Sequence, residues 1–269
     1  MSTYQFGFLG VGNMGGALAR AAAKTLPAEK IAVSSRTLEK AQAMAKELGC
    51  TALEDGALAL RSDFVFLGVK PQVLPGVLRD LAPILASRRE PFCLVSMAAG
   101  LTLERIGTIL GMDCPVIRIM PNTPAGVGSG MILYTANSLV TEEMKRAFLQ
   151  GMAQTGRFDE LPEGLMDAGS AVSGCGPAFV CQFVEALADG GVACGLPRAK
   201  AQMYAAQMVL GTAQMILESG SHPGELKDAV CSPGGSTIQG VRLLEQRAMR
   251  GAVTDAVIAA YDKTQDMGK

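Results

Sequence analysis

The sequence predicts an α/β domain with a parallel sheet, followed by an all-α domain. Short apolar runs alternate with helix-like stretches over residues 5–120, and a glycine-rich turn follows the first run. Beyond about residue 160 no run of the earlier strand type recurs. Alternating strands and helices favour a parallel sheet covered on both faces. We therefore expect domains at residues 1–160 and 161–269.

Each element follows from this alternation. The expected strands are residues 5–9, 31–34, 64–69, 92–96 and 116–120, and the expected helices are residues 14–25, 38–48, 73–86 and 102–111. After Pro124 we expect a further strand within "AGVGSGMILYTAN", a helix over 142–152 and a strand near 156–161.

The C-terminal helices indicate a partner. Residues 177–193 carry apolar side chains at the helical period, and a helix from Pro197 to about Ser219 is apolar over much more than one stripe. Such a helix must be buried on several sides, which a domain of ~110 residues rarely achieves alone. We expect a second copy of the chain to complete this domain as a homodimer.

Composition excludes several classes of function. The 269 residues are 49% hydrophobic and 18% charged, with a net charge of −1 and no long basic run, so we expect a small-molecule ligand rather than nucleic acid or a membrane surface. No export signal or uninterrupted apolar span is recognisable, which predicts a cytoplasmic protein. Seven cysteines without a C-x-x-C pair, and a single histidine, predict no metal site.

The first glycine turn, "FLGVGNMGG", is typical of a Rossmann-like dinucleotide site. Gly10, Gly12 and Gly15 have the G-x-G-x-x-G spacing between the first strand and an Ala-rich helix. In this context Gly10 makes the tight turn, Gly12 lets the pyrophosphate approach the backbone, and Gly15 lets the helix pack closely. The helix N-terminus supplies amides and the positive end of its dipole.

The next strand end, "VSSRT", favours NADP. An NAD site would place a carboxylate on the ribose at this point, whereas Ser34, Ser35 and Arg36 offer hydroxyls and a guanidinium suited to a 2'-phosphate. An ordinary solvated charge at a strand end is the alternative for Arg36.

Three further turns follow expected strands. "LGVKPQ" contains Val69, Lys70 and Pro71, and "SMAAG" contains Ala98. Small residues there would let a cofactor lie against the backbone, although tight turns explain them about as well. "RIMPNTPAG" forms a rigid polar loop in which Asn122 is placed for the nicotinamide end, with an ordinary crossover as the alternative.

A second glycine turn, "VCSPGGSTIQG", precedes a C-terminal helix. Ser236 and Gln239 have capping-box spacing, but a cap does not account for Gly234 and Gly235. Consecutive glycines before a helix expose amides in a concave arrangement suited to an anion, here most simply a substrate carboxylate. Thr237 then lies within reach of the group beside that carboxylate.

The sequence shows no arrangement of residues typical of a catalytic acid or base, such as paired carboxylates. His222 precedes Pro223 and reads as a helix-start residue, and no Ser-His-Asp arrangement is recognisable. Reduction of a ketone normally needs a proton donor. A protonated imine would need only hydride, position and a hydrogen bond.

The motifs "FLGVGNMGGAL", "SSRT", "VKPQ", "RIMPNTP", "VSGCGPAF" and above all "HPGELKDAVCSPGGSTIQGVRLLE" resemble pyrroline-5-carboxylate reductase, in order and over nearly the whole chain. The resemblance implies NADPH- or NADH-dependent reduction of 1-pyrroline-5-carboxylate to L-proline, the last step of proline biosynthesis. It also implies a Rossmann domain, a helical domain interlocked in a dimer, and commonly a decamer of five dimers.

The resemblance also implies roles for individual residues. Pyrophosphate contacts fall on Gly10, Gly12, Asn13, Met14 and Gly15, 2'-phosphate contacts on Ser34, Ser35 and Arg36, and nicotinamide contacts on Val69, Lys70, Pro71, Ala98 and Asn122. The amides of Gly234, Gly235, Ser236 and Thr237 would hold the carboxylate, and the Thr237 hydroxyl would bond the ring nitrogen as the catalytic group. Family members often carry Asn at the position of Ser35, and this difference leaves the choice between NADPH and NADH open.

Two other functions compete with this interpretation. A β-hydroxyacid dehydrogenase shares the glycine turn and a helical second domain, but needs a lysine on the interdomain helix. Residues 177–195 contain none, and Lys200 falls past the break. A non-catalytic NADP-binding sensor is the other alternative.

Overall fold

The computed structural model describes residues 3–267. The chain forms two compact units, one comprising Met1–Gly174 with Ala260–Lys269 and the other Cys175–Ala259. The last strand of the sheet ends at Glu160, although the first unit continues through one more helix. A division of function at residue 160 stays a prediction.

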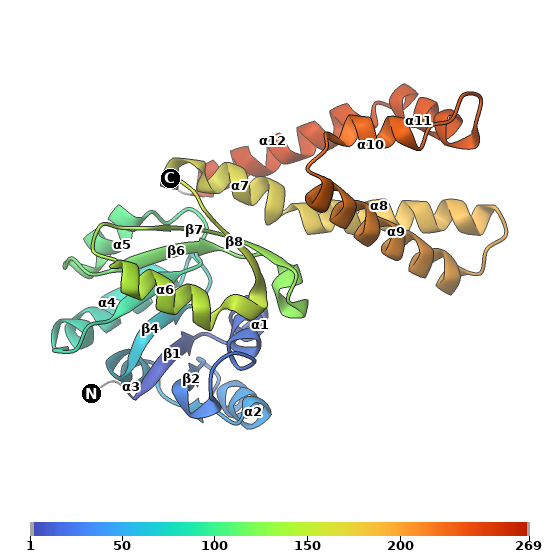
Figure 1. The fold of residues 1–269 in the computed structure, drawn as a ribbon. Coiled ribbons are helices and arrows are strands. Elements are labelled where there is room, and N and C mark those ends of the chain that lie inside the picture. The colour runs from blue at the N-terminus through green and yellow to red at the C-terminus, as the bar shows by residue number, and fades with distance from the viewer. Residues whose placement is uncertain (1–2, 268–269) are drawn as a thin grey trace. The chain divides into compact units, whose positions relative to one another are not determined.

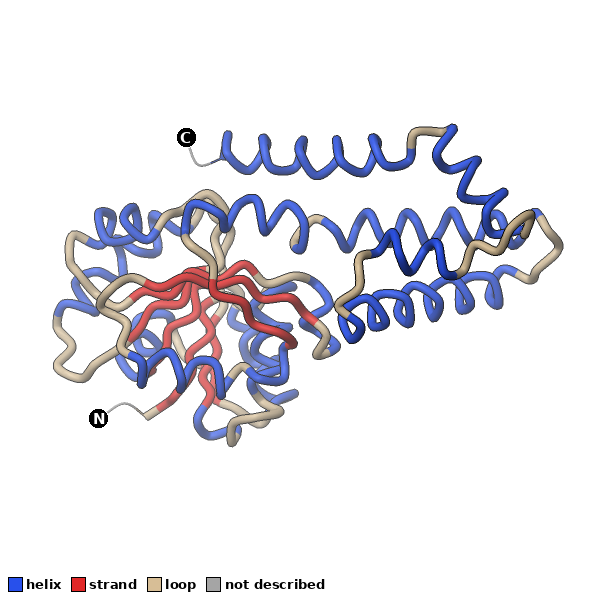
Figure 2. The backbone as a smooth tube through the Cα atoms, turned by 45° about the horizontal axis from the view of Figure 1, so that its top comes forward, coloured by secondary structure: helices blue, strands red, loops and turns tan. Residues whose placement is uncertain are grey.

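The first unit is built around a β-sheet (Figures 1 and 2). The sheet has eight strands in the order β3-β2-β1-β4-β5-β6-β7-β8. The strands are β1 Tyr4–Leu9, β2 Ile31–Ser34, β3 Thr51–Ala52, β4 Ser62–Leu67, β5 Cys93–Ser96, β6 Val116–Met120, β7 Gly130–Ala136 and β8 Gly156–Glu160. All neighbours are parallel except β6 and β7. The predicted parallel sheet is therefore confirmed, and the antiparallel pair was not predicted.

Helices cover both faces of this sheet. They are α1 Asn13–Ala22, α2 Leu38–Leu48, α3 Asp55–Arg61, α4 Leu74–Ala86, α5 Leu103–Leu110, α6 Glu142–Gly151 and α7 Met166–Ser173, with short 3-10 turns η1 Ala28–Lys30, η2 Thr123–Val127, η3 Ala153–Thr155 and η4 Glu163–Leu165. One core joins the sheet to α1, α2 and α6, and the other joins it to α3, α4 and α5. The strands are therefore buried on both sides, which explains their nearly continuous apolar sequences.

Local sequence signals set several helix ends. The Thr102 side chain caps α5 by accepting a hydrogen bond from the Arg105 amide, and Gly111 ends that helix at φ +65°. Thr141 caps α6 in the same way. The predicted elements are present, but β3 and α3 were not predicted. A two-residue strand and a seven-residue helix are too short for periodicity to register.

Three glycines meet at the centre of the sheet, where β1 lies between β2 and β4. A Cβ atom on Gly15 would lie 2.0 Å from the carbonyl oxygen of Gly10, and one on Gly68 would lie 2.5 Å from the same oxygen. Gly10 itself has φ +96°. Only residues without side chains allow α1 to begin this close to the ends of β1 and β4.

The described residues of the second unit form helices joined by loops and no strand, as predicted. It contains α8 Gly176–Ala193, α9 Arg198–Ser219, α10 Pro223–Ala229, α11 Ser236–Gln246 and the first part of α12 Met249–Met267 (Figure 1). Its buried apolar residues are only Ala188, Ala201 and Ala205. Large side chains stay exposed instead, among them Met203 at 59%, Leu210 at 59% and Leu217 at 70%. A single copy of this unit therefore lacks a core of ordinary size.

Residues 163–193 pass a length and composition test for a membrane span, with 11% of the tested window buried. This stretch spans η4, α7 and α8, and part of it belongs to the exposed apolar surface of the helical unit. The same surface fits burial against protein, and one stretch of this length and composition is weak evidence for a membrane segment.

Replacing Gly15 by Ala should destabilise the protein by about 3 kcal/mol, because the added methyl group collides with a backbone carbonyl that cannot move aside. Urea unfolding at fixed protein concentration measures the loss. Gly76→Ala is the matched control, since a Cβ there would meet nothing within 4 Å. Equal unfolding midpoints for the two variants would contradict the proposed backbone contact.

Candidate active site

A cleft of about 520 Å³ opens in the first unit at the carboxyl ends of its central strands. Its lining residues are Gly12, Asn13, Met14, Gly68, Val69, Lys70, Met97, Met120 and Pro121. Ligands of open α/β sheets bind at this edge, beside the point where the strand order reverses. The structure thus brings Gly12, Asn13, Met14, Val69 and Lys70 together at one cleft, and their binding of a cofactor stays a prediction. Sequence reasoning did not single out Gly68, Met120 or Pro121 as site residues, although each lies at or just after a strand end.

The start of α1 faces this cleft with open backbone. Gly12 is the N-cap residue, and no side chain caps the helix. A Cβ atom on Gly12 would meet nothing within 4 Å, so this position borders empty space. The first amides of a helix lack intrahelical acceptors and favour an anion. The geometry fits a phosphate group lying against the backbone of Gly12.

The end of β2 carries the residues predicted to meet a 2'-phosphate. Ser34 is buried, its carbonyl accepts a hydrogen bond from the Gly10 amide at 3.0 Å, and its Oγ has no hydrogen-bond partner in the structure. Ser35 is half-buried and Arg36 is exposed. Ser34 therefore supports the glycine turn through its backbone, and the side chains of Ser35 and Arg36 are the more accessible ones.

The other predicted nicotinamide contacts do not line the cleft. Ala98 is buried, and its amide donates to Ser96 Oγ at 3.4 Å. Pro71 lines a separate cavity of about 270 Å³. Asn122 is 8% exposed, and both polar atoms of its side chain already have protein partners. These residues shape the surroundings of the cleft rather than its wall.

The second glycine turn lies in the helical unit, directly before α11. The Gly235 amide donates to the Ser232 carbonyl at 3.0 Å, and Gly234 has φ +71°. With Pro233 between them, this is the pattern of a type II turn, which needs a glycine at its third position. Glycine is required at position 234 because the backbone there is left-handed.

The predicted capping box at the start of α11 is wrong. Gly235 is the N-cap residue, Ser236 is the first residue of the helix, and no side chain caps it. Gln239 instead accepts a hydrogen bond from Arg242 Nε at 3.3 Å. Because of the type II turn, α11 begins at Ser236, one residue earlier than it would if Ser236 were the N-cap. The first helical amides, at Ser236 and Thr237, consequently lack intrahelical acceptors and can receive an anion.

His222 has the structural role that the sequence predicted. It is the N-cap of α10, and its Nδ1 accepts a hydrogen bond from the Gly224 amide at 3.0 Å. The imidazole ring therefore caps the first turn of α10. The dehydrogenase lysine is also missing from α8, because Lys200 lies on α9.

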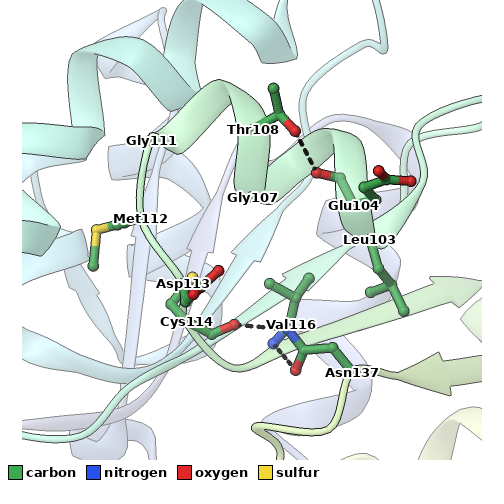
Figure 3. A pocket seen from close by; sticks show the side chains of 10 residues that line it. All are labelled: Leu103, Glu104, Gly107, Thr108, Gly111, Met112, Asp113, Cys114, Val116 and Asn137. Carbon is green, nitrogen blue, oxygen red and sulfur yellow. Dashed lines mark hydrogen bonds between the residues drawn. The ribbon is translucent and has the colours of Figure 1, made fainter.

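Figure 3 shows another cavity, of about 500 Å³, at the opposite end of β6. Asn137 lies in its wall, where Oδ1 accepts from the Val116 amide at 3.2 Å and Nδ2 donates to the Cys114 carbonyl at 2.8 Å. Burial, and secondarily the charge of Asp113, raise the pKa of the Cys114 thiol to about 11, so it stays protonated near neutral pH. Asn137 and Cys114 thus have structural roles.

Comparisons with known proteins agree with the two-part architecture. A family model described as pyrroline-5-carboxylate reductase dimerisation matches residues 163–267, and one described as NADP oxidoreductase, coenzyme F420-dependent, matches residues 5–100. A pyrroline-5-carboxylate reductase from Synechocystis is 44% identical, and one from Escherichia coli is 40% identical, each over 98% of both chains. A Plasmodium falciparum pyrroline carboxylate reductase, solved with NADP bound, matches all of both chains with a TM-score of 0.89 and 31% identity.

These likenesses cover 98% of the chain for the two relatives and all of it for the solved structure. The chain belongs to the pyrroline-5-carboxylate reductase family.

Proposed function

We propose that the chain reduces 1-pyrroline-5-carboxylate to L-proline, the last step of proline biosynthesis, with NADPH as the preferred reductant. The observation that carries this proposal is the second glycine turn at the N-terminus of α11, with Thr237 in its first helical turn. The first glycine turn has the geometry for a cofactor phosphate, so the second serves the anionic group of the substrate. Family membership supports the same reaction.

The cofactor residues proposed from the sequence fit the cleft to different degrees. Gly10, Gly12, Asn13, Met14 and Gly15 would hold the pyrophosphate, and Ser34, Ser35 and Arg36 would hold the 2'-phosphate. Val69 and Lys70 would contact the nicotinamide, whereas Pro71, Ala98 and Asn122 would lie around the cleft without lining it. When bound, NADPH supplies the hydride. The NADP found in the Plasmodium relative supports this choice, and NADH remains the alternative.

In the substrate site, the amides of Gly234, Ser236 and Thr237 would hold the carboxylate. Gly235 contributes its small size more than its amide, since that N–H already donates to Ser232. The Thr237 hydroxyl would hydrogen-bond the ring nitrogen and orient the C=N bond. As hydride reaches the imine carbon, the C=N bond becomes single and nitrogen keeps its proton or gains one from water through Thr237. Proximity and charge placement carry such a reaction without a strong acid.

The exposed apolar side chains of α8 and α9 support a homodimer. Burying them against a second copy supplies the core that the single unit lacks. We also propose a decamer of five dimers, which the family resemblance implies, and a cytoplasmic location, as expected in the sequence analysis.

A single assay separates the proposed reaction from its two competitors. Purified protein should oxidise NADPH, and more slowly NADH, when 1-pyrroline-5-carboxylate is added. A panel of β-hydroxyacids with NADP⁺ should give no turnover. Turnover with a hydroxyacid would favour the dehydrogenase, and tight NADPH binding without any turnover would favour the sensor.

Replacing Thr237 by Val keeps the side-chain shape and removes the hydroxyl. We expect kcat/KM for 1-pyrroline-5-carboxylate to fall by roughly 10²-fold, with NADPH binding unchanged, because one hydrogen bond at the reacting nitrogen is lost. Thr108→Val, at an exposed helical position whose hydroxyl bonds only the Glu104 carbonyl, is the control. Full turnover by Thr237→Val would remove the role given to this residue.

A further inference from the structure

Helix α7 is fastened to strand β6 near both of its ends. In the first turn of α7, Asp167 Oδ1 accepts a hydrogen bond from Arg118 Nη2 at 2.7 Å. At the last residue of α7, the Ser173 carbonyl accepts one from Asn122 Nδ2 at 2.9 Å. Arg118 lies within β6, and Asn122 follows its carboxyl end. The two side chains therefore hold one helix against one strand.

The contact at Arg118 is buried and joins several segments. The Arg118 side chain is 2% exposed, and its Nη1 also lies 3.4 Å from Glu163 Oε1. Glu163 accepts a hydrogen bond from the Leu103 amide at 2.7 Å. Asp167 uses its other oxygen, Oδ2, to accept from Gln265 Nε2 at 2.9 Å. A charged group this deeply buried needs such partners, and removing one is costly.

The contact at Asn122 uses the whole side-chain amide. Oδ1 accepts from the Met131 amide at 3.0 Å, while Nδ2 donates to the Ser173 carbonyl. Only this orientation of the amide satisfies both neighbours, because one offers N–H and the other C=O. Asn122 thus joins the end of β6, the start of β7 and the end of α7.

The fastened helix lies where the chain leaves the first unit. Ser173 is followed by Gly174, the last residue of that unit before Cys175 begins the helical one. Gln265, which shares Asp167, belongs to the segment that returns from the helical unit. Asn122, which bonds the end of α7, directly follows Met120 and Pro121, and these two residues line the cofactor cleft. The end of β6 is common to the cleft and to the junction.

We propose that Asn122 and Arg118 are positioning residues for hydride transfer, which hold α7 so that the chain enters the helical unit from a fixed point beside the cofactor cleft. This inference rests on the proposed function, in which the cofactor residues belong to one unit and the carboxylate-binding turn to the other. A displacement of about 1 Å between reacting groups can lower a rate by ~10²-fold. Asn122 acts through α7 and not as a ligand of nicotinamide.

Asn122→Asp tests this directly, with Asn137→Asp as a matched control. In each variant the retained oxygen can still accept from a backbone amide, while a carboxylate oxygen replaces the NH₂ group that faces a carbonyl. Asn137 bonds the start of β6 and Asn122 follows the end of the same strand, but only Asn122 bonds α7. Hydrogen exchange of residues 166–176, NADPH affinity by fluorescence, kcat, KM and the isotope effect with NADPH deuterated at C4 are measured on the full-length protein.

For Asn122→Asp we expect faster exchange over residues 166–176 and a kcat lower by ~10- to 100-fold. The isotope effect should rise, while the NADPH Kd stays within about twofold. Asn137→Asp should leave kcat and Kd within about twofold and loosen only residues near 114–116. Asp167→Asn, which removes the charge facing Arg118, should reproduce the Asn122→Asp pattern and serves if that variant does not fold.

Several outcomes would overturn the proposal. A tenfold weaker NADPH affinity with unchanged exchange over residues 166–176 would make Asn122 a cofactor ligand. An unchanged kcat, with or without faster exchange, would remove the positioning role. An equal loss of kcat in Asn137→Asp would indicate general destabilisation of β6. If the unmodified protein does not reduce 1-pyrroline-5-carboxylate, the proposed function fails, whereas exchange and NADPH affinity still decide whether Asn122 holds α7 or contacts the cofactor.

Discussion

The backbone contact among Gly10, Gly15 and Gly68 is the constraint on which the rest of the first unit depends. Side chains at these positions would push α1 away from the ends of β1 and β4, since the Gly10 carbonyl oxygen lies 2.0 Å from the Cβ position of Gly15. Close packing brings the uncapped start of α1 to the edge of the sheet where the strand order reverses. The cleft, its exposed amides and the open space at Gly12 all follow from that placement.

The helical unit, unlike the first unit, has no complete hydrophobic core in a single copy of the chain. Its buried apolar residues are alanines, while the larger methionine and leucine side chains face outward. Hydrophobic burial scales with the area removed from water, so these side chains favour association with a second copy. The second glycine turn, which we propose binds the substrate carboxylate, lies in this same unit, before α11. In our account, assembly thus supplies the rigidity that a reaction based on proximity requires.

Much of this architecture could be predicted from the sequence, because long elements leave a period and both glycine turns have fixed spacing. The antiparallel direction of β7 leaves no such trace, and β3 and α3 are too short. The start of α11 was misplaced because the turn at Gly234, and not a serine cap, sets it. The partners of Asn122 were invisible to local patterns, since Ser173 lies 51 residues away along the chain. Arg118 was missed for the same reason, because Asp167 is 49 residues distant.

The most direct test of the account is to follow the hydride itself. The protein is incubated with NADPH deuterated at both C4 positions and with unlabelled 1-pyrroline-5-carboxylate, and the product is examined by mass spectrometry and proton NMR. We predict L-proline with one deuterium at C5, the carbon that was double-bonded to nitrogen. Unlabelled proline, or NADPH consumption without proline, would contradict direct hydride transfer to the imine carbon.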